Sequence, residues 1–179
     1  PDHENTAIKV AEGLPAGPGG AFGQIVFTSE DAVKWAKQDK DVILVRDETN
    51  PEDIEGMRSA QAILTARGGM TSHAALVARG WGKCCIVGAG ALDIDFEKKI
   101  LRAGPHTFSE GDFITLNGTK GIVYEGQLKM KNATENPRFK KFMDQLIRKE
   151  SIYRGRALLF LKTSYCRLNN AIHLAVNLS

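Results

Sequence analysis

The sequence predicts a mixed α/β fold in which short buried strands alternate with helices. Residues 42–45 and 84–87 are uninterrupted apolar runs, as expected for strands that are buried on both faces of a sheet. Between them helical and extended patterns alternate, which is typical of a layered α/β domain. At 179 residues the chain is long enough for one such domain with an appendage.

The elements before residue 42 are short. Residues 1–10 are expected to end a linker, and the glycine- and proline-rich stretch 12–23 to form turns rather than regular structure. A strand follows at 24–27. A helix is expected at 29–37, capped by Ser29, because its early acidic residues suit the positive end of a helix dipole.

The next elements lead into a loop that carries a histidine. Pro51 suits the first position of a second helix, in which Ile54 and Met57 are spaced to face inward. A strand over 60–64 follows and runs toward a glycine pair. The loop after that strand is therefore expected to hold the histidine, His73.

A further helix and several short strands follow the histidine. The helix over 74–78 is expected to stop at Gly80 and Gly82. After it come the strand at 84–87 and a turn at 88–90. The remaining predicted strands are 100–101, 112–116 and 121–124, with Asn117-Gly118 in the turn of a hairpin. Lys98, Lys99 and Arg102 suggest a phosphate patch, but we interpret them as solvated strand ends.

Charge separates the last 49 residues from the rest. Residues 131–179 carry ten Lys or Arg and three Asp or Glu, net +7, while the preceding residues carry 14 and 18, net −4. Residues 1–130 therefore lack the net positive charge that is typical of a nucleic-acid-binding protein. In the tail, Asn136-Pro137 is expected to cap a basic helix with the apolar stripe Phe139, Phe142, Met143, Leu146 and Ile147. A linker remnant, an alternative C-terminus and a gene-model artefact all remain open for this tail.

Composition excludes other classes. No apolar run approaches the ~20 residues of a membrane span, and the polar start of the chain resembles no signal or transit peptide. Three cysteines do not make a disulfide framework and indicate a reducing compartment, for which we expect the cytoplasm, or the chloroplast stroma if the source is a plant. Because no second ligand cluster lies near them, Cys84 and Cys85 are predicted to be buried thiols rather than metal ligands.

The strongest chemical signal is the stretch 68–85, GGMTSHAALVARGWGKCC. A glycine pair interrupts an apolar strand and good helix formers follow His73, so this histidine is expected at a helix start. Unpaired N–H groups and the dipole at that position favour an anion over a cation, which keeps the imidazole neutral and nucleophilic. The sequence therefore indicates a histidine that can be phosphorylated.

The neighbours of His73 suit that chemistry. Backbone amides and the hydroxyls of Thr71 and Ser72 would hold a phosphoryl group, and Gly68 and Gly69 would let its donor come close. A Thr-Ser pair before an alanine-rich helix is also an ordinary cap, and a lone histidine in a first turn is more often a surface or packing residue. Spacing alone leaves both interpretations open.

A family resemblance bears on that choice. Gly68-Gly69-Met70-Thr71-Ser72-His73-Ala74-Ala75, followed by Ala78-Arg79, resembles the phosphohistidine signature of the phosphoenolpyruvate (PEP)-utilising enzymes. Blocks within 12–16, 23–27 and 43–53 match the same family, so the resemblance covers roughly residues 11–126 and is more specific than a single motif. Met70 and the extension 80–85 resemble the pyruvate phosphate dikinase branch. PEP synthase and enzyme I of the sugar phosphotransferase system, the alternative branches, commonly lack that extension.

The resemblance implies a fold and a reaction. The fold is a swivelling β/β/α phosphohistidine domain with a layered mixed sheet over 11–130, followed by a helical appendage over 131–179. The full enzyme would use ATP and Mg²⁺ to interconvert ATP, phosphate and pyruvate with AMP, pyrophosphate and PEP. A separate nucleotide-binding domain would phosphorylate His73 on Nε2, and a separate pyruvate/PEP-binding barrel would accept the phosphoryl group. This chain has no GxxxxGK[ST] loop and no acidic cluster with magnesium-ligand spacing, so we expect it to bind no cofactor and not to complete the reaction alone.

The resemblance also implies roles for the surrounding residues. Arg67 and Arg79 are candidates for neutralising phosphate charge, with a solvated or packing role equally open. In plant dikinases a kinase and a phosphatase act on the threonine two residues before the histidine, which maps onto Thr71. A second anion there would repel the phosphoryl donor. The branch usually has Ser at the position of Gly17, so no hydroxyl contact is expected there.

One rival hypothesis belongs to another functional class. The chain would then be a truncated, non-catalytic module that binds a partner through the basic face of residues 139–147. Such a module would not be phosphorylated, so phosphoryl incorporation separates the two hypotheses.

Overall fold

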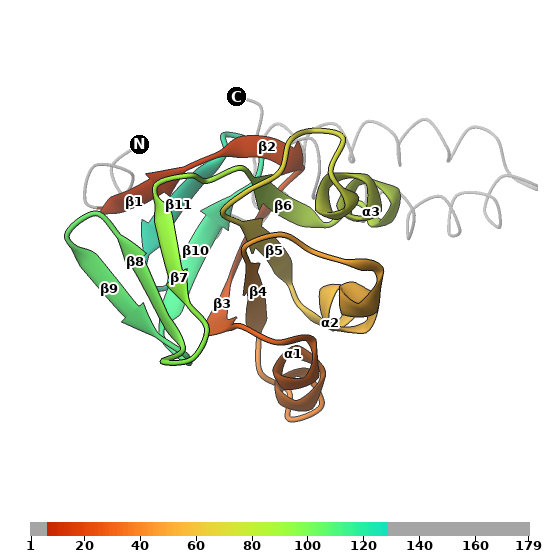
Figure 1. Ribbon diagram of the computed structural model, residues 1–179, viewed down its shortest axis with the longest axis horizontal. Helices are drawn as coiled ribbons and strands as arrows, with labels where there is room; N and C mark the ends of the chain where they lie inside the picture. The colour runs from red at the N-terminus through yellow and green to blue at the C-terminus, as the bar shows by residue number, and fades with distance from the viewer. Residues whose placement is uncertain (1–6, 129–179) are drawn as a thin grey trace, which may run out of the picture. The chain divides into compact units, whose positions relative to one another are not determined.

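The computed structural model describes residues 7–128, which form three layers (Figure 1). The middle layer is an eight-stranded mixed sheet with the strand order β1-β11-β10-β3-β4-β5-β6-β2. A three-stranded antiparallel sheet, β7-β8-β9, covers one face, and helices α1, α2 and α3 cover the other. The mixed α/β class expected from the sequence is confirmed. The predictions for the tail, including its apolar stripe, lie outside the described residues.

The elements have the following bounds. The strands are β1 Lys9–Glu12, β2 Leu14–Gly17, β3 Gly20–Val26, β4 Val42–Arg46, β5 Ala62–Thr65, β6 Cys84–Val87, β7 Leu92–Asp95, β8 Ile100–Ala103, β9 His106–Ser109, β10 Phe113–Asn117 and β11 Ile122–Glu125. The helices are α1 Ser29–Ala36, the 3-10 turn η1 Pro51–Asp53, α2 Ile54–Ser59 and α3 His73–Trp81.

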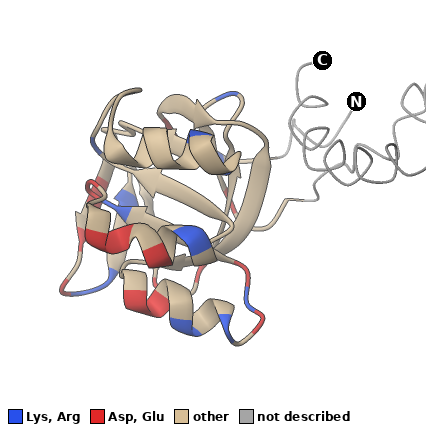
Figure 2. Ribbon diagram, turned by 90° about the vertical axis from the view of Figure 1, so that its right-hand side faces the viewer, with Lys and Arg blue, Asp and Glu red and all other residues tan. Residues whose placement is uncertain are grey.

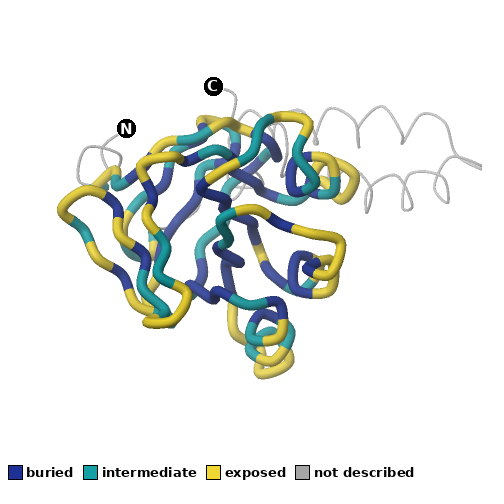
Figure 3. The backbone as a smooth tube through the Cα atoms, in the orientation of Figure 1, coloured by how far each residue is buried: buried dark blue, intermediate teal, exposed yellow. Residues whose placement is uncertain are grey.

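Two apolar cores lie on the two faces of the large sheet, and this explains the uninterrupted apolar runs. Ile43 packs into the core shared with the three-stranded sheet, while its neighbour Leu44 packs into the core shared with the helices. Successive side chains of a strand point to opposite faces, so a strand covered on both sides needs an apolar residue at every position. Strands β4, β5 and β6 are accordingly buried along almost their whole length (Figure 3).

The large sheet curls until its two edges meet. β1 ends at Glu12 and β2 begins at Leu14, yet these strands occupy opposite ends of the strand order. Gly13 alone joins them, and its N–H donates to the carbonyl of Gly121 at 2.8 Å. Only a strongly curved sheet can bring its first and last strands within one residue of each other.

Several local predictions were wrong for physical reasons. The stretch 12–23 contains β2 and most of β3, and Lys9 already belongs to β1 rather than to a linker. Thr28, not Ser29, caps α1, because its hydroxyl accepts from the Asp31 N–H at 3.0 Å. The Ser29 hydroxyl is buried and instead accepts from the N–H of Gly56 on α2 at 2.9 Å.

Two further details differ on the helices. Met57 is fully buried as expected, whereas Ile54 at the start of α2 remains 38% exposed. Helix α3 runs past Gly80 to Trp81 and ends at Gly82, whose φ of 63° is the left-handed cap conformation that glycine favours. The four central strands, the hairpin between β10 and β11 and the helix beginning at His73 are all confirmed.

Candidate functional site

The candidate site lies where the parallel strands β3, β4, β5 and β6 end. Their carboxyl ends share one edge of the sheet, which is the common location of ligand sites in open α/β sheets. The loops continue the strand pairing beyond that edge: Ala66 N–H donates to the Arg46 carbonyl at 3.0 Å, and Gly88 N–H donates to the Arg67 carbonyl at 3.3 Å. These bonds fix the loop that follows β5 between the loops that follow β4 and β6.

His73 is the first residue of α3. Ser72 is the N-cap, with extended backbone, and its hydroxyl accepts from the Ala75 N–H at 3.4 Å. The helix is followed by β6, and its inner face is made of buried alanines. The expected position of the histidine at a helix N-terminus is therefore what the structure shows.

The imidazole of His73 is engaged on one nitrogen. Its Nδ1 lies 3.2 Å from the hydroxyl of Thr49, a residue in the loop after β4 that is only 6% exposed. Within residues 7–128 the other ring nitrogen, Nε2, has no hydrogen-bond partner, and the residue as a whole is half-buried. A ring held through Nδ1 presents Nε2 as its reactive atom.

The two glycines before the helix have different structural roles. Gly68 has a φ of +96°, and a Cβ added there would lie 3.0 Å from the Cβ of Ser72. At Gly69 an added Cβ would meet no atom within 4 Å. Gly68 is thus required by the backbone turn, whereas Gly69 leaves open space on the outside of the loop.

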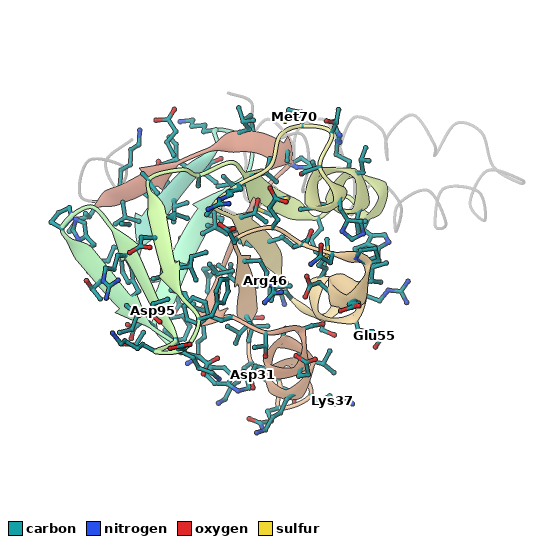
Figure 4. The ribbon with its side chains drawn as sticks, in the orientation of Figure 1. Asp31, Lys37, Arg46, Glu55, Met70 and Asp95 are labelled. Carbon is teal, nitrogen blue, oxygen red and sulfur yellow. The ribbon has the colours of Figure 1, made fainter. Side chains whose placement is uncertain are left out.

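The hydroxyl residues of the motif also differ. The cap hydroxyl belongs to Ser72, while Thr71 is exposed and has no part in the capping bond. Met70, which Figure 4 labels in the same loop, is also exposed. The expectation that Thr71 and Ser72 both cap the helix is therefore wrong for Thr71.

Both candidate arginines have partners within the protein. Arg67 is largely exposed and forms an ion pair with Asp47 at 3.3 Å. The guanidinium of Arg79 donates to the carbonyls of Ala75, at 3.2 Å, and Met70. Arg79 therefore ties the loop ahead of His73 to the first turn of α3.

Charge is otherwise sparse around the start of α3. Figure 2 shows acidic and basic residues along α1 and α2, whereas α3 is almost wholly uncharged and carries Arg79 alone. In the described range, no group of three or more His, Cys, Asp or Glu side chains is placed to hold a metal ion, and no helix is long and apolar enough to cross a membrane.

The other reactive groups near α3 are buried. The thiols of Cys84 and Cys85 lie in the sheet, and burial raises the pKa of each to about 12. The ammonium of Lys83 donates to three backbone carbonyls at the end of α2. Burial, and to a lesser extent the charge of Arg58, lowers the pKa of Lys83 to about 8. We assign these three residues to packing and capping.

Thr49 is the site residue that sequence reasoning missed. Its partner lies 24 residues along the chain, so no local pattern reveals the contact. The available signal was positional: Thr49 follows a buried strand whose carboxyl end shares an edge with the strand leading to His73.

Comparisons with known proteins find a matching family model and several similar proteins. Residues 38–121 match the family model described as PEP-utilising enzyme, mobile domain. The chain is 53% identical to "Pyruvate, phosphate dikinase 1, chloroplastic" of Arabidopsis thaliana over 134 residues, which are 75% of this chain and 14% of the plant protein. It is 54% identical to "Pyruvate, phosphate dikinase 2" of Zea mays over 118 residues, 66% of this chain and 13% of the relative.

A bacterial relative is similar over a longer stretch. "Pyruvate, phosphate dikinase" of Clostridium symbiosum is 47% identical over 147 residues, which are 80% of this chain and 17% of the bacterial protein. The chain thus spans less than a fifth of the length of these three curated relatives.

Proposed function

Because residues 38–121 are a mobile domain of the PEP-utilising enzymes, we propose that His73 carries a phosphoryl group between two other domains of one enzyme. One domain would bind ATP and phosphorylate the ring, and a barrel domain would bind pyruvate and receive the phosphoryl group as PEP. The whole reaction is that of a pyruvate phosphate dikinase, the activity in the names of the relatives.

The chemical step needs a lone pair on Nε2. This nitrogen attacks the β-phosphorus of the nucleotide, a P–N bond forms, and the P–O bond to AMP breaks with its electron pair on the AMP oxygen. Inorganic phosphate takes the γ-phosphoryl group and leaves as pyrophosphate, so one phosphoryl group stays on Nε2. In the second transfer the enolate oxygen of pyruvate attacks the same phosphorus, and the P–N electron pair returns to Nε2. The covalent intermediate divides one difficult transfer into two easier ones.

One observation carries the proposal. The ring is bound through Nδ1 to Thr49, while Nε2 has no partner among residues 7–128 and stands at the N-terminus of α3. The start of a helix leaves backbone N–H groups without intrahelical partners, which suits a phosphoryl anion at that position. Gly69 supplies open space for its approach, and the Thr71 and Ser72 hydroxyls and the Gly68 backbone are proposed to contact the phosphate.

Phosphate charge is proposed to be met mainly by those neutral donors. Arg67 is already paired with Asp47, and Arg79 is bonded to the backbone. Each remains a candidate for neutralising charge through the guanidinium N–H groups that these contacts do not use. Mg²⁺ and ATP are proposed to bind to the nucleotide domain of the full enzyme, because the relatives are named pyruvate, phosphate dikinases.

The direct test is phosphoryl incorporation. The chain would be incubated with a purified dikinase nucleotide domain, Mg²⁺ and ATP labelled in its β- and γ-phosphates. We expect an acid-labile, alkali-stable phosphoprotein in which mass spectrometry locates the label on His73. His73→Ala should abolish labelling, while His106→Ala on β9, which removes a histidine bonded to Glu125, should not. Retention of the label in His73→Ala would refute the assignment.

A second test concerns the division of labour. Alone, the chain should not form PEP from ATP, phosphate and pyruvate, because the proposal assigns nucleotide binding and pyruvate binding to two other domains. The measurement is PEP formation with and without the two partner domains. Synthesis of PEP by the chain alone would overturn the carrier role.

Regulation at Thr71 forms part of the same proposal. This side chain is exposed and lies two residues before His73, so a kinase can reach it without unfolding the loop. A phosphate on Thr71 would place a second anion beside the ring and repel the incoming donor. Thr71→Glu should therefore lower His73 labelling, and Thr71→Ser, which keeps the hydroxyl and adds no charge, should not.

A further inference from the structure

We propose that Arg46 and Asp53 are positioning residues for His73: their ion pair fixes the loop over 47–53 and so holds the Thr49 hydroxyl against Nδ1. The catalytic consequence rests on the carrier function proposed above. The structural part of the proposal is that the ion pair determines which nitrogen of the His73 ring carries the proton. That part does not depend on any phosphoryl transfer.

Asp53 is a buried carboxylate with two partners. It is 5% exposed, and its Oδ2 accepts from the Asn50 N–H at 2.9 Å and lies 3.5 Å from Nε of Arg46. The capping box between Asn50 and Asp53 starts the turn η1. A single carboxylate thus closes the loop at its far end and ties it back to Arg46 at its beginning.

Arg46 is itself fixed from several sides. Its guanidinium donates to the Phe27 carbonyl at the end of β3, at 3.1 Å, and lies 5.4 Å from the ring centroid of Phe96. Nε is buried and makes no hydrogen bond within the described residues, so its interaction there is with the charge of Asp53. Figure 4 labels Arg46 at the end of β4, the strand that leads into the loop.

Thr49 lies in the loop between Arg46 and Asp53, the two residues whose ion pair clamps the loop at its ends. Its neighbour Asn50 is bonded to Asp53, and the loop backbone before it pairs with the loop after β5 through the Arg67 N–H, which donates to the Asp47 carbonyl at 2.9 Å. Both flanks of Thr49 are therefore held, and its buried hydroxyl is left 3.2 Å from Nδ1 of His73. A buried ion pair whose partners are both held by further contacts favours one arrangement over its alternatives.

The contact matters because a hydroxyl can bind Nδ1 in two ways. Thr49 can accept from an Nδ1–H, or donate to a bare Nδ1. Only the first leaves the lone pair on Nε2, the nitrogen without a protein partner. We infer that the clamped loop favours the Nδ1–H tautomer by holding Thr49 as an acceptor.

The test measures the ring and the reaction separately. ¹⁵N NMR of the neutral His73 ring reports which nitrogen carries the proton, and the labelling assay reports the transfer rate. Thr49→Val, which removes the hydroxyl, and Asp53→Asn, which removes the charge, should both shift the ring toward the Nε2–H tautomer. Both should slow labelling by about 10-fold to 100-fold, as expected when a reacting group is misplaced, with little change in the KM for the donor domain.

Matched controls separate positioning from general damage. Thr49→Ser keeps a hydroxyl, so the tautomer and the labelling rate should be those of the wild type. Arg46→Lys keeps the charge, so the tautomer and the labelling rate should be retained in part. Asp93→Asn removes an exposed ion pair, with Arg102 on the three-stranded sheet, and should change neither. In the double variant of Thr49→Val with Asp53→Asn, labelling should be no slower than in Thr49→Val alone.

The outcomes are decisive. If Asp53→Asn leaves the tautomer unchanged, or if the two substitutions act additively on the rate, Asp53 does not act through Thr49 and the inference is wrong. If Asp53→Asn proves too unstable to purify, the tautomer measurement can still be made. The comparison of Thr49→Val with Thr49→Ser tests the same contact between the Thr49 hydroxyl and Nδ1 of His73. A wild-type chain that shows the Nδ1–H tautomer but is never labelled would contradict the proposed function and not this inference.

Discussion

The edge that carries His73 and the rim of the three-stranded sheet both contain ion pairs, but only the His73 edge leaves a reactive nitrogen without a partner among residues 7–128. On the rim, cations are matched by carboxylates: Lys99 lies 2.9 Å from Asp31 and 2.7 Å from Glu110, and Arg102 lies 3.1 Å from Asp93. At the His73 edge the ion pairs Arg67–Asp47 and Arg46–Asp53 lie beside contacts to backbone and to the ring, and Nε2 of His73 is left without a partner among residues 7–128.

This difference supports the proposed position of the phosphoryl group at the start of α3. The basic residues after β7 resemble a phosphate patch by composition alone, yet their charge is already neutralised. The start of α3 has few charges, but its N–H groups and cap hydroxyl are oriented by the fold. Backbone N–H groups at a helix start bind anions such as phosphate.

The largest effect should come from Gly68 compared with Gly69. Gly68→Ala forces a side chain into a φ of +96° and against Ser72, so it should lower the free energy of unfolding by about 1–3 kcal/mol and abolish most labelling. Gly69→Ala meets no neighbour, so stability should change by less than ~0.5 kcal/mol, while labelling slows because the methyl group occupies the donor's path.

Urea unfolding and the labelling assay on both variants test this contrast. Equal losses of stability would show that the loop does not hold Gly68 in a strained conformation. Undiminished labelling of Gly69→Ala would show that the donor approaches from another side.

The next effect concerns the sheet beneath the site. The pKa of Cys85 is raised to about 12 by burial, while an unfolded thiol titrates near 8.5. Between these values the folded state binds more protons, so stability should fall as pH rises, with a limiting slope of about 1.4 kcal/mol per pH unit for each thiol.

Comparison of the wild type with Cys85→Ala isolates the contribution of this thiol to the pH dependence of stability. Urea unfolding of both proteins between about pH 8 and pH 10 should show a shallower decline in the variant, although the variant is less stable at neutral pH because of its cavity. Lys83, whose pKa is lowered to about 8, acts in the opposite direction but equally in both proteins. Identical slopes would mean that the folded state does not hold the thiol protonated.

The parts of the fold that were predicted are those whose cause is local. Strands β4 and β6 were evident because burial on both faces leaves an unbroken apolar run. The start of α3 was evident because Ser72 and the alanines after His73 are local signals. These causes lie within a few residues of the effect.

The parts that were missed have causes far away in the chain. Gly17 was interpreted as part of a turn, yet it lies in β2, where a side chain would collide with the carbonyl of Lys83. Glycine at position 17 permits two backbones to approach closely. In the sequence, however, a glycine is also a typical turn residue, and the two cases look alike. Thr49 was missed for the same reason, because only the folded sheet brings it to His73.

A smaller effect is expected on the rim. Lys99→Gln removes two ion pairs whose lysine is 41% exposed, so it should lower the free energy of unfolding by at most about 1 kcal/mol and leave His73 labelling unchanged. The Lys99 hydrogen bond lowers the pKa of Asp31. The stability that this interaction contributes is therefore present above the ordinary carboxyl pKa and is lost as pH falls through the lowered pKa of Asp31. The free energies of unfolding of the wild type and of Lys99→Gln should therefore converge at acid pH. A marked drop in labelling at neutral pH would make the rim part of the site after all.

The smallest effect is a gain at the far end of α3. Gly80 lies within the helix, and a Cβ there would meet no atom within 4 Å. Since alanine favours a helix interior over glycine, Gly80→Ala should raise the free energy of unfolding by about 0.5–1 kcal/mol, with His73 labelling unchanged. Thermal unfolding measures the gain, and Gly82→Ala is the matched opposite: its φ of 63° is unfavourable for alanine, so that variant should be destabilised. If Gly80→Ala is also destabilised, Gly80 acts as the helix stop that its sequence context suggested, and α3 ends one turn closer to His73.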